Sequence, residues 1–67
     1  MKVYEAWNTV KYTNSKSTRF DQAGVVMAEA QDTDKTVKVR WDVAPDGSPG
    51  VDVEDVKLSD LVMLQSN

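Results

Sequence analysis

The chain of 67 residues contains neither histidine nor cysteine. Histidine is the commonest general base in enzymes, cysteine is a frequent nucleophile, and the two together dominate zinc sites. Serine, threonine and lysine are common in this sequence, but no spacing among them indicates an activated nucleophile. We therefore expect no catalytic residue, no metal site and no cofactor, and we predict that the protein is not an enzyme.

The carboxylates fall into two groups, and neither has the spacing of a known ligand set. The first group lies in segments that read as turns: Asp32, Asp34, Asp42 and Asp46. It lacks the glycine and terminal glutamate that a calcium-binding EF-hand loop has at fixed positions. The second group is an acidic run near the C-terminus: Asp52, Glu54, Asp55 and Asp60. This run predicts a solvated strand edge, or a face that docks a basic partner or mimics nucleic acid.

Basic side chains gather in the first part of the chain. Residues 1–40 carry seven basic and five acidic side chains, for a net charge of +2. Residues 41–67 carry one basic and six acidic side chains, for a net charge of −5, so the net charge of the chain is −3. The candidates for phosphate contacts are Lys11, Lys16, Arg19, Lys38 and Arg40. Because phosphate neutralisation supplies most of the affinity for nucleic acid, the acidic total favours a mixed solvated surface. RNA or DNA binding is the alternative function.

Short strands must position these side chains, since no segment has the periodicity of a full helix. Residues 1–8 have no clear period and are expected to be a lead-in that lays aromatic side chains on the core. Alternation over residues 9–13 predicts the first strand. A polar loop follows at residues 14–19 and ends at Phe20, which either folds the loop back over the core or lies at the rim of a binding face.

A hairpin of residues 25–30, entered through Gly24, and 36–41, joined by a polar turn at 31–35, is the predicted centre of the fold. Gly24 indicates positive φ, a bulge or a close approach of the backbone. Glu29 sets the register of the first strand, because the opposite register would bury this carboxylate. The residues expected to face inward are Val26, Ala28 and Ala30. Val25 and Met27 then lie on the outer face, where the N-terminal segment covers them or a partner binds them.

The second strand of the hairpin alternates cleanly. Val37, Val39 and Trp41 share the face that we expect in the core, and the indole N–H of Trp41 would then need a hydrogen-bond partner. Residues 42–50 contain two prolines and two glycines and predict a long, mobile loop.

The C-terminal strand pattern changes parity. Val51 and Val53 share one face, whereas Val56 and Leu58 have the opposite parity, which predicts a β-bulge near Glu54 and Asp55. A 3₁₀ turn over residues 58–61 and a closing strand over residues 62–65 complete the expected order of elements.

This order resembles that of small SH3-like barrels, and more narrowly the KOW-type barrels of NusG-like transcription factors and the related Tudor-like domains. The segments that carry the resemblance are residues 9–12, 20, 24–26, 37–42 and 56–62, within a similar region of about residues 8–65. The resemblance implies one all-β domain over residues 1–67, a five-stranded SH3-like barrel with a 3₁₀ turn before the last strand. The chain departs from the pattern in its acidic charge, which is unusual for an RNA-binding KOW domain. It has five aromatic side chains, several of which must fill the core rather than form a Tudor cage.

These observations favour a small non-catalytic module that binds another protein as an accessory or regulatory subunit. The expected contact residues are Trp7, Lys11, Lys16, Arg19, Phe20, Val25 and Met27. A third hypothesis is a subunit of an oligomeric assembly in a phage or an enzyme complex. The lack of cysteine and of an apolar N-terminal segment predicts a cytoplasmic protein of a bacterium or a phage-infected cell. No apolar run approaches the roughly 20 residues that a membrane-spanning helix needs.

Overall fold

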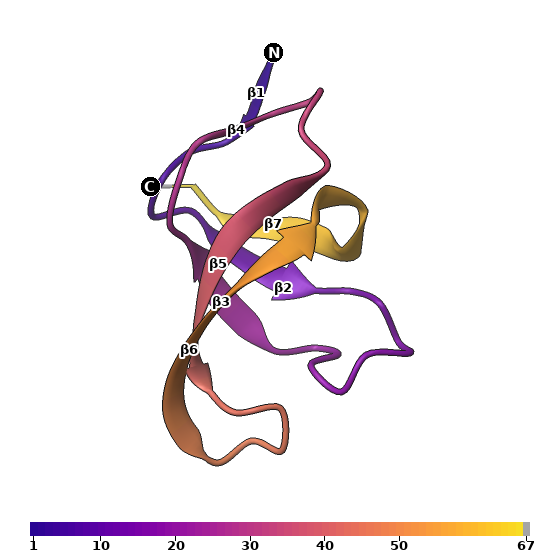
Figure 1. The fold of residues 1–67 in the computed structure, drawn as a ribbon, viewed down its shortest axis with the longest axis vertical. Helices are drawn as coiled ribbons and strands as arrows, with labels where there is room; N and C mark the ends of the chain where they lie inside the picture. Colours follow the sequence, from indigo (N-terminus) through magenta and orange to yellow (C-terminus); the bar gives the residue numbers. More distant parts are fainter. Residues whose placement is uncertain (67) are drawn as a thin grey trace.

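Residues 1–66, which the computed structural model describes, form seven strands and one 3₁₀ turn (Figure 1). The elements are β1 (Lys2–Tyr4), β2 (Thr9–Tyr12), β3 (Ala23–Val26), β4 (Ala30–Gln31), β5 (Thr36–Val43), β6 (Pro49–Lys57), the 3₁₀ turn η1 (Leu58–Asp60) and β7 (Leu61–Gln65). Five strands form one antiparallel sheet in the order β6-β5-β3-β2-β7, and β1 pairs with β4 in a second, two-stranded sheet. The prediction of an all-β fold with one 3₁₀ turn before the last strand is confirmed.

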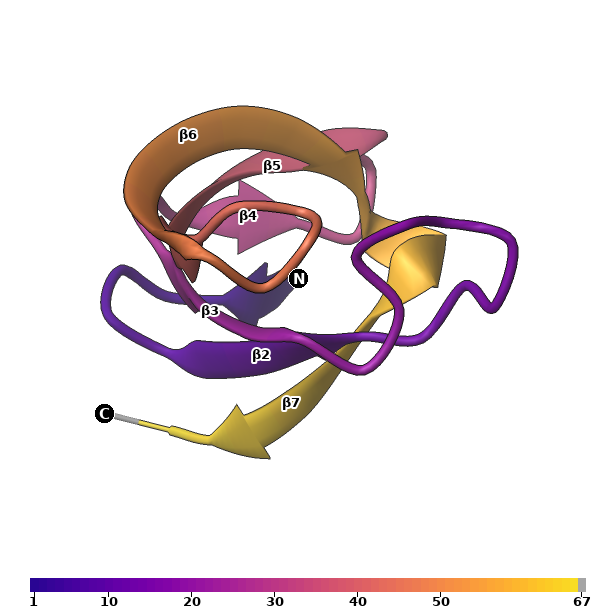
Figure 2. The same ribbon diagram turned by 90° about the horizontal axis from the view of Figure 1, so that it is seen from below.

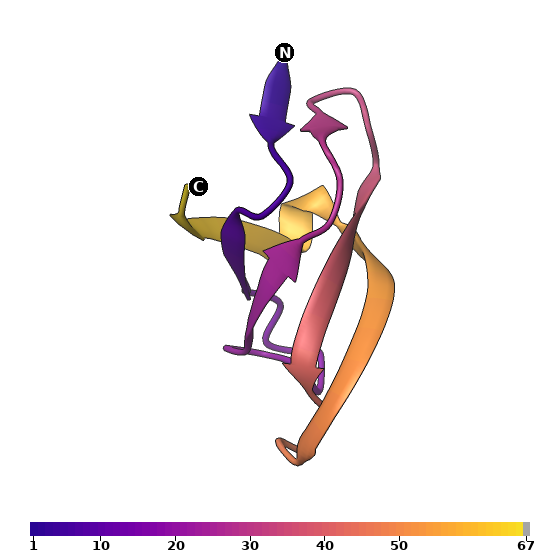
Figure 3. The ribbon, with the colours of Figure 1, turned by 90° about the vertical axis from the view of Figure 1, so that its left-hand side faces the viewer.

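The prediction of a closed barrel is wrong. The five-stranded sheet curls around the core (Figure 2), but within residues 1–66 no ladder joins its edge strands β6 and β7. The 3₁₀ turn between these strands changes the direction of the chain, so that β7 runs across the direction of β6 (Figure 3). The expected lead-in over residues 1–8 does place one aromatic side chain, Tyr4, in the core, but it also contains β1, which pairs with β4 rather than with the main sheet.

The central hairpin is confirmed in its pairing but not in the length of its first strand. β3 pairs with β5 through Val25 opposite Arg40 and Val26 opposite Val39. The chain then leaves this sheet after Val26, and Ala30 begins β4 on the other sheet. Val26 and Ala30 are buried as predicted, whereas Ala28 is exposed because it lies in the break between the two strands.

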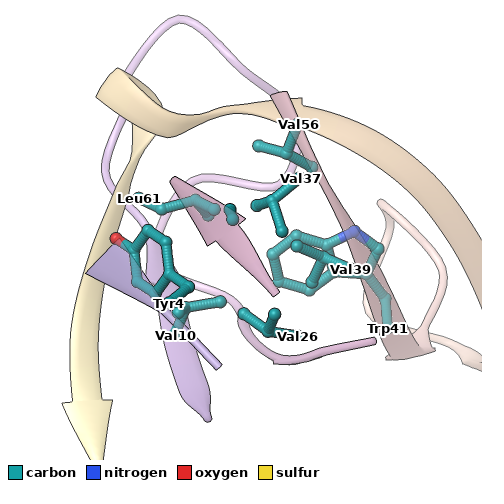
Figure 4. Packing of buried hydrophobic residues seen from close by; sticks show 9 residues of the cluster. Tyr4, Val10, Val26, Val37, Val39, Trp41, Val56 and Leu61 are labelled. Carbon is teal, nitrogen blue, oxygen red and sulfur yellow. The ribbon is translucent and has the colours of Figure 1, made fainter. Parts of the chain in front are cut away.

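Nine buried hydrophobic side chains form the core (Figure 4). They are Tyr4, Val10, Val26, Ala30, Val37, Val39, Trp41, Val56 and Leu61, with Tyr12 and Leu58 packed against them. The predicted inward face of β5 is therefore confirmed. The indole N–H of Trp41 differs from the expectation, because it is buried without a hydrogen-bond partner among residues 1–66.

Gly24 is a position of close backbone approach, one of the three predicted alternatives. A Cβ atom added here would lie 2.6 Å from Cε3 of Trp41 and 2.7 Å from Cγ1 of Val39. Only a residue without a side chain lets β3 pass this close to the largest core side chain.

The bulge predicted near Glu54 and Asp55 is absent. From Lys57 to Asp52 each residue of β6 pairs one-to-one with β5, and the register shifts only between Trp41 and Val43. As a result Asp52, Glu54 and Val56 share the inward face of β6, while Val51 and Val53 are exposed.

The irregular loop predicted over residues 42–50 is shorter in the structure. β5 continues to Val43 and β6 begins at Pro49, which leaves residues 44–48 as a tight turn. In this turn Gly47 has a φ of +88°, and the Asp46 carboxylate accepts hydrogen bonds from the backbone N–H and the hydroxyl of Ser48 at 2.9 and 2.7 Å. Pro49 fits a strand here because β6 is an edge strand, where a missing N–H donor is tolerated.

Candidate protein-binding surface

Arg19, expected on a polar surface loop, is buried with only 3% of its area exposed. Its Nη1 donates to the carbonyl oxygen of Val43 at 2.8 Å and to Oε1 of Gln22 at 3.1 Å. Its Nη2 lies 2.7 Å from Oδ2 of Asp52, and its Nε lies 3.0 Å from Oε1 of Glu54. The guanidinium is thus engaged inside the molecule, and Arg19 is not part of an exposed surface.

The same guanidinium explains the uninterrupted register of β6. Its carbon atom lies 5.1 Å from the ring centroid of Trp41, so Arg19 covers one end of the core. Asp52 and Glu54 must face inward to reach it, which places their side chains on the same face as Val56. Two ion pairs of the buried Arg19 with partly exposed carboxylates therefore accompany a regular strand where the alternation of apolar residues predicted a bulge.

The other predicted phosphate-binding residues do not stand as free cations. Lys11 lies 2.7 Å from Asp21. Lys38 lies 3.6 Å from Asp55, and Arg40 lies 3.4 Å from Asp42. Together with Arg19, four of the five candidates have carboxylate partners, and within residues 1–66 Lys16 is the one without an ion pair.

Trp7 is 54% exposed and has a φ of 74°. Positive φ is a genuine outlier for a bulky side chain. The turn that imposes it is closed by two hydrogen bonds between Glu5 and Asn8, from Asn8 N–H to the Glu5 carbonyl at 3.2 Å and from Glu5 N–H to the Asn8 side chain at 2.8 Å. The Trp7 N–H also donates to the Val26 carbonyl at 2.7 Å. The structure therefore holds this aromatic ring at the surface at a cost in backbone strain.

The remaining predicted contact residues lie on separate elements. Phe20 is exposed on the loop between β2 and β3, together with Lys16. Val25 and Met27 are half-buried, and Val25 lies between Thr9 and Arg40 in the register of the sheet. Each of these residues is at least partly exposed, as predicted for Val25 and Met27. The residues lie on different strands and turns.

Another run of exposed apolar side chains lies on β7, outside the predicted contact residues. Val62, Met63 and Leu64 of β7 are exposed by 46%, 37% and 53%. β7 is an edge strand, and Leu61–Gln65 carries no charged residue. The signal in the sequence was the run of three apolar residues, which does not alternate as a half-buried strand should.

Two neighbouring hollows lie beside this strand, and Val3 and Met63 line both of them. The first measures about 380 Å³ and is also lined by Lys2, Glu5, Asn8 and Ser66. The second measures about 410 Å³ and is also lined by Tyr4, Asp32, Leu58 and Ser59. Met63 of β7 thus faces a partly apolar depression between β1, η1 and β7.

Two side chains that line these hollows, Lys2 and Tyr4, have raised pKa values. The Nζ of Lys2 lies 3.3 Å from Glu29 and 3.4 Å from Glu5. Hydrogen bonds to these two carboxylates raise the pKa of Lys2, and the bond to Glu29 has the larger effect. Burial raises the pKa of the Tyr4 hydroxyl. Both shifts keep the proton on the side chain, so neither group is poised to act as a base near neutral pH.

Residues 1–66 hold no cluster of three or more histidine, cysteine, aspartate or glutamate side chains that could bind a metal ion. No helix in the same range is long and apolar enough to cross a membrane.

No family model, curated protein or solved structure matches the chain.

Proposed function

We propose that the protein is a non-catalytic protein-binding module that accepts an extended segment of a partner along the open edge of β7. The observation that carries the proposal is the uncharged, exposed run of Val62, Met63 and Leu64 on an edge strand. Natural proteins usually protect such edges with charges, prolines or a covering element, because an open edge is a template for pairing with another chain. An unprotected edge therefore supports a binding role.

The backbone directions along β7 also support this mode of binding. Thr13 N–H donates to the Asp60 carbonyl at 2.8 Å, which directs the polar groups of Asp60 toward β2. Polar groups alternate in direction along a regular strand, and β7 pairs regularly with β2 from Leu61 to Met63, so the polar groups of Leu61 and Met63 point to the open edge; the register shifts only beyond Met63, before Gln65. The N–H of Leu61 accordingly donates to the Leu58 carbonyl within η1 rather than to β2. Met63 is then the residue of β7 whose N–H and carbonyl point away from β2, toward an incoming strand.

Side chains around the edge supply the apolar contacts. Met63 lines both hollows with Val3, and Leu58 lies in the second hollow. In strand addition, main-chain hydrogen bonds supply affinity and pockets for alternate side chains supply specificity. One apolar side chain of the partner would occupy this depression. The accessory or regulatory role, the SH3-like character and the cytoplasmic location stay predictions from the sequence.

Nucleic-acid binding is the weaker proposal. The ion pairs of Lys11, Arg19, Lys38 and Arg40 leave few cations to neutralise phosphates, and the net charge is −3. Affinity for a polyanion depends on such cations.

Affinity capture from lysate tests the two proposals together. The wild-type protein, Met63→Lys on β7 and Val53→Lys on the opposite edge strand would each be used with nuclease-treated and untreated lysate. We expect a defined protein to be retained by the wild type and by Val53→Lys in both lysates, and to be lost with Met63→Lys. Loss of all retained protein after nuclease treatment would instead support nucleic-acid binding, and equal retention by both variants would exclude β7 as the site.

A further inference from the structure

We infer that the strand accepted by β7 is β7 of a second copy of this chain, paired antiparallel about a two-fold axis at Met63. The inference rests on the proposed function, because it takes the open edge of β7 as the binding site and names its occupant. Two copies related by this axis would join their five-stranded sheets into one continuous sheet across the two β7 strands.

The charge pattern of the two edge strands selects β7 rather than β6. A two-fold axis at Met63 places Met63 opposite its own copy and Val62 opposite Leu64, with no charged residue in Leu61–Gln65. A two-fold axis at Val53 on β6 would place Asp52 opposite Glu54 of the second copy. Like charges that face each other across a ladder are destabilising. Self-pairing is therefore compatible with one edge of the sheet and opposed at the other.

The directions of the polar groups fit the same arrangement. The N–H and carbonyl of Met63 point to the open edge, so two copies can exchange a pair of hydrogen bonds between their Met63 residues. Directly opposite residues lie on the same face of a sheet. The two Met63 side chains would then meet on the face of the hollows, and Val62 and Leu64 would pair on the opposite face.

The size of the contact predicts a weak dimer. A stable interface buries about 800 Å² on each partner, and the whole chain exposes 4322 Å². The contact would consist of one five-residue strand and the adjoining hollow on each partner, against about 20–30 residues a side in a standard interface. We therefore expect a monomer–dimer equilibrium in the micromolar to millimolar range rather than an obligate dimer.

Sedimentation velocity over about 10 µM to 1 mM, a range that spans such weak affinities, tests the inference. Val62→Lys with Leu64→Lys places like charges opposite each other in the dimer and should weaken association at least tenfold. Val62→Lys with Leu64→Glu places opposite charges there and should restore much of it. Val53→Lys on β6 should leave association unchanged, and circular dichroism should confirm the fold of every variant.

Hydrogen exchange on the wild-type protein gives a second readout that needs no substitution. The amide of Met63 should exchange more slowly as the protein concentration rises, while the amide of Val53 on β6 should not change in this way. A monomer at the highest concentration, or a dimer unaffected by the two lysines, would overturn the inference. Failure of the Glu variant to recover would overturn the antiparallel register. If the protein is monomeric but captures a lysate protein through Met63, the proposed function stands and its partner is a different chain.

Discussion

Arg19 shows how a cation on a polar loop can become an interior residue. Its guanidinium is covered by the Trp41 ring on one side and paired with Asp52 and Glu54, which stay partly exposed. A guanidinium is weakly hydrated and presents several donors in a plane, so it tolerates burial among such partners better than an ammonium. Arg19 thus attaches the loop between β2 and β3 to the far edge of the sheet.

We expect Arg19→Ala to lower the free energy of unfolding by about 2–3 kcal/mol, because it removes packing on Trp41 and several charge-assisted hydrogen bonds. Lys11→Ala, which removes the more exposed pair with Asp21, should cost less than about 1 kcal/mol. Urea denaturation of the two variants measures both values. Equal costs would mean that the burial of Arg19 contributes nothing beyond a surface ion pair.

Gly24→Ala should lower the free energy of unfolding by about 2–3 kcal/mol, because the new methyl group would overlap the Trp41 ring. Gly50 is the matched control, since it also lies in a strand but a Cβ there meets no atom within 4 Å. Gly50→Ala should be neutral or slightly stabilising. Thermal unfolding followed by circular dichroism distinguishes the two, and a tolerated Gly24→Ala would contradict the close packing.

Trp7→Gly should be more stable than Trp7→Ala by about 0.5–1 kcal/mol, because both remove the indole but only alanine keeps a Cβ at positive φ. At most positions an alanine variant is more stable than a glycine variant, so the expected order of stability is the reverse of the usual one. Chemical denaturation of both variants provides the test, and the ordinary order would show that the backbone at Trp7 is relaxed in solution.

At the scale of elements, the two edge strands of the sheet differ in how they meet solvent. β6 has three carboxylates and begins with Pro49, features that discourage pairing with another strand. β7 has neither carboxylates nor a proline, and its exposed residues Val62, Met63 and Leu64 are apolar.

The connection between β2 and β3 contains a non-glycine residue in the left-handed region. Asp21 has a φ of 73°, and its N–H donates to the Tyr12 carbonyl at 2.9 Å. Aspartate here occupies a conformation that glycine usually takes in a bulge of this kind.

At the scale of the whole molecule, a chain of 67 residues has little interior, and one cluster of nine hydrophobic side chains forms its core. A domain of this size buries only about 60% of the surface that its unfolded chain exposes, so its stability is marginal. Both properties make ionisation of a single buried group visible in the stability of the entire fold.

Stability should decline as the pH rises above about 10, because burial raises the pKa of Tyr4 above its ordinary value of 10.0. In that range the unfolded chain loses the Tyr4 proton while the folded chain keeps it, so unfolding becomes more favourable with increasing pH. Tyr4→Phe should reduce this decline, whereas the raised pKa of Lys2 acts in the same direction and remains in the variant. Urea midpoints between pH 8 and pH 11 measure the slopes, and identical slopes would contradict the prediction.

The sequence alone determined the class of the fold and most of its core. Alternation identified β2, β5 and the inward positions of Val37 and Val39, because side-chain direction in a strand has a period of two. Glycine and proline predicted a loop over residues 42–50, of which residues 44–48 form the turn, and the short pattern before the last strand predicted η1. The outward positions of Val25 and Met27 followed from the cost of burying Glu29.

Only the tertiary structure decided where charges and edges lie. Arg19 is buried because Asp52 and Glu54, more than thirty residues away in sequence, reach it from another strand, and no local pattern contains that contact. The split of the predicted strand into β3 and β4 depends on pairing with β1, and the open edge of β7 depends on the direction taken after η1. Periodicity reports which face of a strand is apolar, but the neighbours of that strand are set by long-range packing.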